Sequence, residues 1–133
     1  MILVDTSVLI DTITGTQSDK VNLFLSAIKA DILFGISEYT YLETLQGARN
    51  SKEYNQLNEY LLNMHIYLLP KTIKTYDVAA QLYFNLRRQG ITPRSTIDVL
   101  IALTAMEYDL FLLHDDKDFD MMAAKMPSLK VYE

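Results

Sequence analysis

The feature that most constrains the fold is the alternation of short apolar runs with longer amphipathic segments along the chain. Uninterrupted apolar runs of this kind are typical of β-strands that are buried on both faces. Strands separated by helices indicate βα units and hence a parallel sheet. We therefore predict an α/β fold, a three-layer α/β/α sandwich with a four- to five-stranded, mainly parallel sheet. The expected strands cover residues 2–4, 32–36, 65–69, 110–113 and 129–132.

The segments between these runs carry apolar residues three to four positions apart, which is the spacing of one face of an α-helix. The expected helices cover residues 8–13, 19–30, 39–47, 52–64, 72–89, 95–108 and 119–125. No linker, repeat or low-complexity stretch divides the chain, and half of its 133 residues are hydrophobic. We expect residues 1–133 to form a single domain with its own core.

The composition excludes several kinds of chemistry. The chain has no cysteine, which rules out structural disulfides, thiolate zinc sites, iron–sulfur clusters and cysteine nucleophiles. The apolar N-terminal run contains Asp5 and lacks the basic start of a signal peptide. The longest nearly uncharged run, residues 99–106, falls far short of the roughly 20 residues that cross a bilayer. We therefore expect a cytoplasmic protein with no membrane partner.

Several acidic residues fall where a parallel sheet would bring them together. Asp5 directly follows the first expected strand, and Glu43 lies on the helix after the second. Asp98 lies in the first turn of the 95–108 helix, and Asp116 and Asp118 follow the 110–113 strand. Because the carboxyl ends of parallel strands meet at one edge, where open α/β sheets bind ligands, we expect these acids to converge.

Each acid also has a purely structural interpretation. Asp5 would suit a helix N-terminus, and Thr40 with Glu43, like Ser95 with Asp98, has the spacing of a capping box. A cap contributes only about 1 kcal/mol. Two carboxylates about 6 Å apart repel each other by roughly 3 kcal/mol at an effective dielectric of about 20. Convergent acids would therefore need a cation, and oxygen-only ligands favour Mg²⁺ or Mn²⁺.

Four segments, taken in order, resemble the acidic motifs of a known family. Val-Asp-Thr-Ser-Val-Leu-Ile at residues 4–10 resembles the opening motif of PIN domains, and Glu-Thr-Leu-Gln-Gly at residues 43–47 resembles the second. Residues 90–102 and 112–120 resemble the third and fourth motifs, and are most similar to those of VapC-type toxins of toxin–antitoxin pairs. The ordered match spans the chain, which thus resembles a free-standing PIN domain.

This resemblance implies a metal-dependent endoribonuclease that acts as the toxin of a VapBC-type pair. By position, it implies that Asp5, Glu43, Asp98 and Asp116 form the catalytic and metal-binding quartet, with Asp118 as an auxiliary acid beside them. The quartet would hold Mg²⁺ or Mn²⁺, and a metal-activated water would hydrolyse the RNA phosphodiester.

The resemblance also implies supporting residues and partners. Thr6 and Ser7 would hold the metal shell or a water through hydroxyls and backbone amides, and Ser95 would assist near Asp98 or only cap its helix. The implied partners are the RNA substrate, a second copy of the chain in a homodimer, and a cognate antitoxin whose C-terminal segment covers the acidic site.

The net charge of −5, from 12 basic and 17 acidic residues, argues on its own against a nucleic-acid partner. Setting aside the five acids above leaves twelve acidic and twelve basic residues, so the acidic excess lies in the predicted site itself. A small set of cations is compatible with recognition of RNA shape. The candidate phosphate contacts are Arg94 and Lys117, which flank acidic motifs, and Arg49 and Lys52.

Other functions stay open at this point. A PIN nuclease would also suit RNA processing or DNA cleavage. An α/β phosphatase would use Asp5 as its nucleophile, although such enzymes usually carry a second Asp where this chain has Ser7. A non-catalytic α/β binding module would use the acids only as helix caps. For His114, which precedes Asp116, a substrate contact and a packing role are both open.

Overall fold

The computed structural model describes residues 1–133 and contains five strands and seven helices. The strands are β1 (Ile2–Val4), β2 (Phe34–Ser37), β3 (His65–Tyr67), β4 (Phe111–Leu113) and β5 (Lys130–Val131). The helices are α1 (Thr6–Thr14), α2 (Asp19–Lys29), α3 (Glu38–Gln46), α4 (Ser51–Leu62), α5 (Ile73–Arg88), α6 (Thr96–Glu107) and α7 (Lys117–Lys125). Every expected strand and helix is present, with ends that differ from the expected ones by at most two residues.

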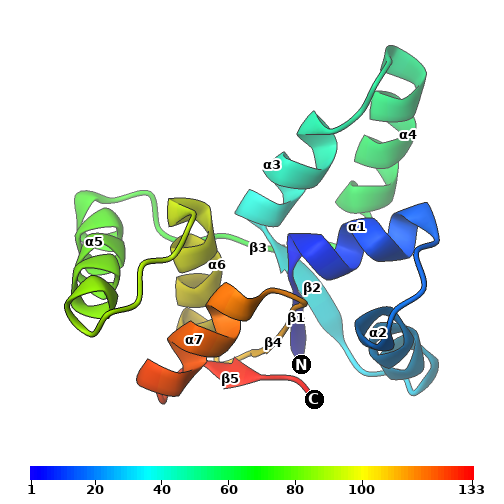
Figure 1. Ribbon diagram of the computed structural model, residues 1–133. Coiled ribbons are helices and arrows are strands. Elements are labelled where there is room, and N and C mark those ends of the chain that lie inside the picture. The colour runs from blue at the N-terminus through cyan, green and yellow to red at the C-terminus, as the bar shows by residue number, and fades with distance from the viewer.

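The five strands form one parallel sheet in the order β3-β2-β1-β4-β5 (Figure 1). β1 lies at its centre, where Leu3 is in register with Gly35 on one side and Leu112 on the other. Because all four pairs are parallel, the carboxyl ends of the strands share one edge. The predicted α/β class and parallel sheet are confirmed.

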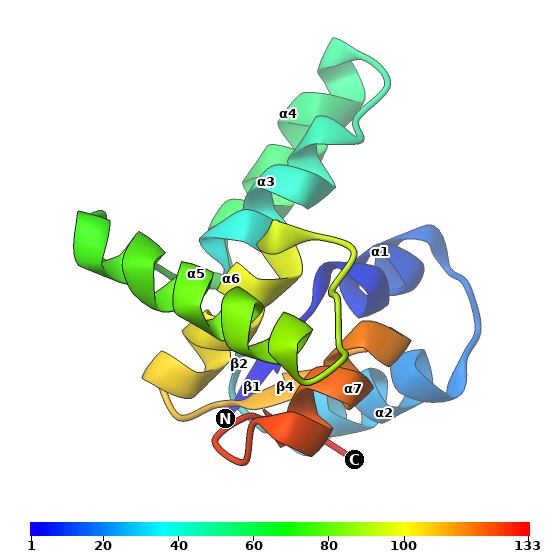
Figure 2. The same ribbon diagram turned by 60° about the vertical axis from the view of Figure 1, so that its left-hand side comes forward.

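The helices cover both faces of the sheet and give it the three-layer form (Figures 1 and 2). Leu3 and Leu112 belong to a core cluster with side chains of α5, α6 and α7, among them Phe119. Their neighbours in sequence, such as Val4 and Leu113, belong to a second cluster with side chains of α1, α2, α3 and α4. Successive strand residues point to opposite faces, so burial of both faces explains the uninterrupted apolar runs.

α6 is buried along most of its length, with every residue from Val99 to Ala105 inaccessible or nearly so. It packs between α5 and the sheet, which holds its N-terminal turn in a fixed place beside the strand ends (Figure 2). α3 and α4 form a hairpin that projects from the body of the molecule (Figure 1). None of the helices combines the length and apolar character required to span a membrane.

Candidate metal centre

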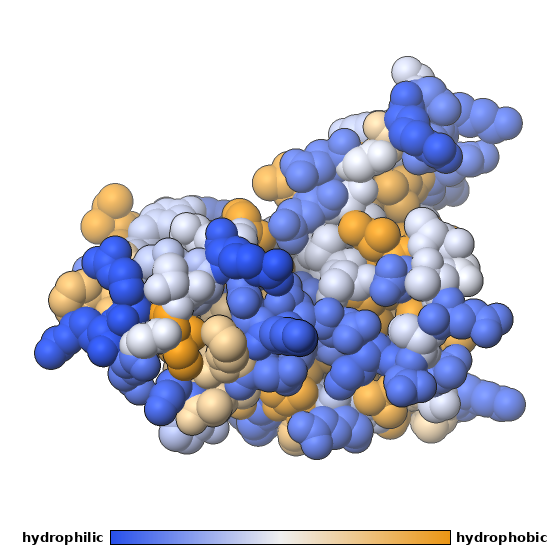
Figure 3. Space-filling model, viewed as in Figure 1, coloured by the Kyte–Doolittle hydropathy of each residue, from blue (hydrophilic) through white to orange (hydrophobic).

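The predicted acids meet at the carboxyl edge of the sheet, where α1, α3 and α7 begin (Figure 1). Asp98, Asp116 and Asp118 each offer an oxygen within 4.8 Å of the others. Asp5 and Glu43 lie near enough for their charges to act on Asp98. Hydrophilic side chains gather at the centre of this face (Figure 3). The structure therefore brings together all five acids that the sequence singled out.

Several of these acids are helix caps as well. Asp5 is the N-cap of α1 and accepts a hydrogen bond from the Ser7 backbone N–H, 3.2 Å away. Asp116 is the N-cap of α7 and accepts from the Asp118 backbone N–H at 2.9 Å. Capping and convergence are therefore properties of the same carboxylates. The helix N-termini add partial positive charge beside them.

One of the two capping-box alternatives is wrong. Thr40 does not begin a helix with Glu43 as the partner of a capping box. Ser37 is the N-cap of α3, and its Oγ accepts hydrogen bonds from the backbone N–H groups of Tyr39 and Thr40. Glu43 instead lies inside α3, on a face that meets α1. The expected Ser95 cap is present, because its Oγ accepts from the Ile97 backbone N–H at 3.1 Å.

Thr6 and Ser7 bind carboxylates directly. Ser7 Oγ donates to Asp5 Oδ2 at 2.6 Å and accepts the Asp115 backbone N–H at 3.3 Å. Thr6 Oγ1 donates to Glu43 Oε1 at 2.7 Å. Two successive residues at the start of α1 thereby tie the first acidic segment to the second and the fourth.

The surroundings of Asp98 disfavour its ionised form. Burial, and after it the negative charges of Asp5, Asp116, Glu43 and Asp118, together raise its pKa to about 7. No hydrogen bond to Asp98 offsets these causes. Burial also raises the pKa of Asp5, against the hydrogen bonds from Ser7, which lower it. A bound cation would remove this repulsion and favour the ionised carboxylates.

Arg94 lies on the acids. Its backbone N–H and its Nε both donate to Asp118 Oδ2, at 3.0 and 3.1 Å, and its Nη2 donates to Asp116 Oδ1 at 3.0 Å. The backbone hydrogen bond from Arg94 lowers the pKa of Asp118, and the guanidinium lowers it further. Asp118 is thus already satisfied by protein donors, whereas Asp98 is not.

The other predicted phosphate contacts lie apart from one another. Lys117 is exposed at the first turn of α7, next to Asp116. Arg49 and Lys52 are exposed where α3 meets α4, and Arg49 pairs with Glu53 at 3.4 Å. Only Arg94 and Lys117 therefore lie beside the acids.

His114 has a place that the sequence left undecided. Its side chain is buried, and its ring packs at 5.1 Å, centroid to centroid, from that of Phe119. Its Nδ1 accepts the Asp116 backbone N–H at 3.1 Å. Burial lowers the pKa of His114, which favours the neutral ring. The packing alternative fits this position, and direct contact with a substrate does not.

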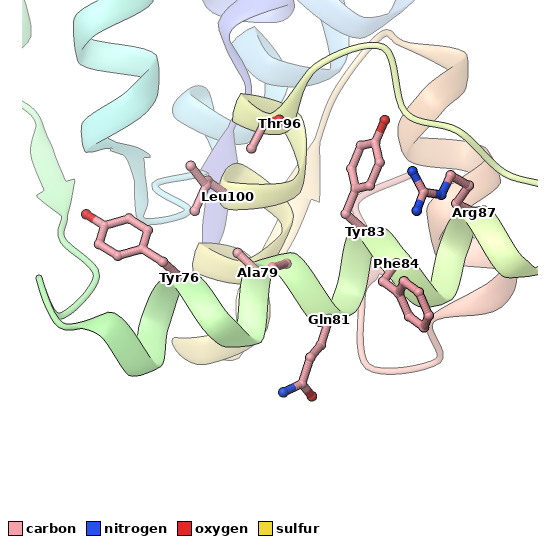
Figure 4. A pocket seen from close by; sticks show the side chains of 9 residues that line it. Tyr76, Ala79, Gln81, Tyr83, Phe84, Arg87, Thr96 and Leu100 are labelled. Carbon is pink, nitrogen blue, oxygen red and sulfur yellow. The ribbon is translucent and has the colours of Figure 1, made fainter.

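The surface also has a groove outside the cluster of acids. A groove of ≈ 580 Å³ runs between α5 and α6 and has no acidic residue in its lining. Tyr83 points into it toward the start of α6, whereas Gln81 and Phe84 point the other way (Figure 4). This groove lacks the ligands of a hard cation, so the acidic edge is the candidate metal centre.

The donor set at the acidic edge fits a hard divalent cation. Asp98, Asp116 and Asp118 supply only carboxylate oxygens, close enough together to share one ion. His114 has its Nδ1 occupied by a backbone N–H, and the chain has no cysteine. Oxygen-only sites of this kind suit Mg²⁺ or Mn²⁺ better than softer metals.

Comparison with known proteins shows which family the chain is similar to. Residues 2–125 match the PIN domain family. Ribonuclease VapC11 of Mycobacterium tuberculosis (strain H37Rv) is 34% identical over 126 residues, which cover 92% of each chain. Ribonuclease VapC6 of the same organism is 30% identical over 122 residues, covering 90% of this chain and 91% of the other.

Two solved structures share the fold. VapBC-1 from nontypeable Haemophilus influenzae has a TM-score of 0.74 at 20% identity, covering 100% of this chain and 98% of the other. VapBC2 from Rickettsia felis, bound to a DNA fragment from the promoter, has a TM-score of 0.72 at 21% identity, covering 99% and 98%. The family match covers nearly the whole chain, and both VapC relatives are at least 30% identical to it. This chain therefore belongs to the PIN domain family and, within it, to the VapC group.

Proposed function

We propose that the chain is a Mg²⁺- or Mn²⁺-dependent endoribonuclease and the toxin of a VapBC-type toxin–antitoxin pair. The observation that carries the proposal is the gathering of four acids around Asp98, whose pKa is raised to about 7 by burial and by these neighbours. Repulsion on this scale is costly to a fold unless a cation relieves it. The relatives named VapC ribonuclease support RNA as the substrate.

Asp5, Glu43, Asp98 and Asp116 would hold the cation, and Asp118 would assist from beside them. When bound, the cation supplies positive charge to the scissile phosphate and lowers the pKa of a water. Asp98 has the most to gain from binding, because no protein donor competes for its oxygens. Its raised pKa means that cation binding near neutral pH releases a proton from it.

The remaining polar residues hold these carboxylates in place. Ser7 donates to Asp5, and Thr6 donates to Glu43, so neither acid is free to turn away from the site. Lys117, which is exposed beside Asp116, is placed to meet a phosphate of the substrate. Arg94 would meet the phosphate only by giving up its hydrogen bond to Asp116.

We take Asp5 as a ligand and not as a phosphatase nucleophile, because Ser7 stands where such phosphatases usually carry a second Asp. Asp5 is buried, with only 4% of the residue exposed. Its Oδ2 already accepts two hydrogen bonds from Ser7, one from the backbone at 3.2 Å and one from the hydroxyl at 2.6 Å. These bonds hold the carboxylate in place and leave its other oxygen available to a cation.

An antitoxin and a second copy of the chain are the proposed protein partners. The structural neighbours are VapBC complexes, in which a toxin is held by its antitoxin. A negative site at an open edge of the sheet suits a partner segment that carries a basic side chain. The proposed occupant of the acidic edge, in the absence of RNA, is therefore the antitoxin.

A cleavage assay tests the nuclease. Partner-free protein is incubated with structured RNAs in Mg²⁺, in Mn²⁺ or in EDTA, beside Asp98→Asn and a control, Asp77→Asn, which changes an exposed acid on α5. We expect cuts with Mg²⁺ or Mn²⁺ from the unmodified chain and from Asp77→Asn only, and none in EDTA. Cleavage by folded Asp98→Asn at the unmodified rate would overturn the proposed site.

A further inference from the structure

His114 joins the fold to the acidic site through a single backbone group. It follows the last residue of β4 and precedes Asp116 by two positions. Its side chain is 2% exposed, so protein atoms hold the ring on nearly all sides. The ring packs against Phe119 of α7, which is itself fully buried. The imidazole ring is therefore held in place by packing, beside the chain segment that carries Asp116.

The hydrogen bond between the two residues fixes the state of the ring. The Asp116 backbone N–H donates to His114 Nδ1 at 3.1 Å. An Nδ1 that accepts a hydrogen bond carries no proton, so the ring is neutral with its hydrogen on Nε2. Nε2 has no hydrogen-bond partner, and the nearest carboxylate oxygen is Asp120 Oδ1 at 3.4 Å. The ring acts on the site through Nδ1.

Asp116 is held at both ends by this arrangement. Its N–H is bound by His114, while its Oδ1 accepts from the Asp118 backbone N–H at 2.9 Å and from Arg94 Nη2 at 3.0 Å. The preceding N–H, that of Asp115, is bound by Ser7 Oγ. Two successive backbone amides between β4 and α7 are thus anchored by buried or half-buried side chains, which restricts how Asp116 presents its second oxygen.

We propose that His114 is a positioning residue for the metal centre: by accepting the Asp116 backbone N–H on Nδ1, its buried ring fixes the direction in which Asp116 offers its carboxylate to the cation. The inference rests on the proposed function, since it takes Asp116 to be a ligand. Groups that hold a metal ligand by a hydrogen bond orient that ligand, and their loss commonly weakens metal binding. His114 would act without touching the cation or the RNA.

Matched substitutions separate positioning from packing. His114→Asn keeps an acceptor near the place of Nδ1, whereas His114→Leu keeps apolar volume and has no acceptor. His114→Gln has its amide near the place of Nε2 and serves as the variant without the acceptor if His114→Leu fails to fold. Mn²⁺ affinity is measured on each full chain by electron paramagnetic resonance of free Mn²⁺, with thermal unfolding as the check on folding.

We expect His114→Leu and His114→Gln to weaken Mn²⁺ binding by about tenfold or more, and His114→Asn to restore affinity close to that of the unmodified chain. Equal Mn²⁺ affinity in the unmodified chain and in folded His114→Leu would overturn the positioning role and leave the proposed metal site intact. Absence of Mn²⁺ binding to the unmodified chain would instead overturn the proposed function on which the inference rests.

Discussion

Arg94 and Asp118 are joined by two hydrogen bonds to one carboxylate oxygen, from the Arg94 backbone N–H at 3.0 Å and from its Nε at 3.1 Å. The side chain of Arg94 is 75% exposed, so its ion pair with Asp118 contributes little to stability. The backbone hydrogen bond joins the segment between α5 and α6 to the start of α7. It contributes more to stability than the ion pair, because without Asp118 the Arg94 backbone N–H loses its acceptor.

Asp118→Ala should therefore lower the free energy of unfolding by about 1 kcal/mol, chiefly through the loss of the acceptor for the Arg94 backbone N–H. The comparison is Arg94→Ala, which removes the side-chain contacts and keeps the backbone bond, and which should cost less than Asp118→Ala. Urea unfolding at about pH 5, where folded Asp98 is protonated and does not repel Asp118, measures both. A larger loss for Arg94→Ala would assign the tie to the guanidinium instead.

Asp98 predicts an unusual dependence of stability on pH. Its pKa in the fold is about 7, above the ordinary value, so the folded chain binds a proton that the unfolded chain has released. Stability from this proton is fully present below the ordinary pKa of 3.8, falls as the pH rises from there, and is lost by about pH 7. The neutral side chain of Asp98→Asn lacks this penalty.

We expect Asp98→Asn to unfold at nearly the same temperature as the unmodified chain at about pH 4, and at a higher temperature at about pH 8, in the presence of EDTA. Burial lowers the pKa of His114, so the contribution of His114 to stability rises with pH. Both proteins carry His114, and comparing them cancels this opposing effect. Adding Mn²⁺ at about pH 8 should raise the unfolding temperature of the unmodified chain more than that of Asp98→Asn. A difference that did not change with pH would contradict the raised pKa of Asp98.

The first turn of α1 predicts how Mn²⁺ binding depends on pH. Ser7 Oγ donates to Asp5 Oδ2, and this bond lowers the pKa of an acid that burial raises. Ser7→Ala removes that bond, so the pKa of Asp5 rises and protons compete better with the cation. Mn²⁺ affinity should fall by about tenfold at about pH 6 and by less at about pH 8.

Thr12→Val is the control for Ser7→Ala. Thr12 Oγ1 donates to the Val8 backbone carbonyl at 2.8 Å, within the same helix and away from the acids. Its loss should leave Mn²⁺ affinity unchanged at both pH values. If the two substitutions changed affinity alike, the effect would belong to α1 as a whole and not to the Ser7 hydroxyl.

Most of the fold is predictable from the sequence because both kinds of pattern are strong. The apolar runs stop at polar residues such as Asp5 and His114, and the sheet ends its strands at the same places. α6 is predictable as a helix from its length, although it has almost no polar face, because it packs between α5 and the sheet. The order of strands in the sheet does not follow from periodicity, since it depends on which crossovers the packed helices allow.

The acids of the site are predictable for the same topological reason, since each follows a strand or begins a helix at one edge. The partners of these acids are not. Arg94 reads in sequence as a cation free for phosphate, but it lies on Asp116 and Asp118, which are distant in sequence. The His114 ring that accepts the Asp116 backbone N–H packs against Phe119, and spacing in the sequence does not give the orientation of that ring. Spacing alone therefore locates the centre but not the groups that orient it.

Gly35 in β2 predicts a further constraint on the site. A Cβ at this position would lie 2.6 Å from the His65 backbone carbonyl oxygen and 2.6 Å from Tyr67 Cε2, both in β3. β2 continues into Ser37, the cap of α3, which carries Glu43. Gly35→Ala should therefore cost about 1–3 kcal/mol of unfolding free energy, since the backbone of β3 must move to make room.

Gly47→Ala is the matched control, because its Cβ would meet nothing nearer than the Thr44 carbonyl oxygen at 3.5 Å and its φ is −78°. That substitution should stabilise the chain by about 0.4–1 kcal/mol through a smaller entropy of the unfolded state. Urea unfolding of both variants decides the matter. If Gly35→Ala were as stable as the unmodified chain, β3 would move to accept the new Cβ at no cost in free energy. The close approach of β2 to β3 would then not constrain the edge of the sheet at which α3 carries Glu43.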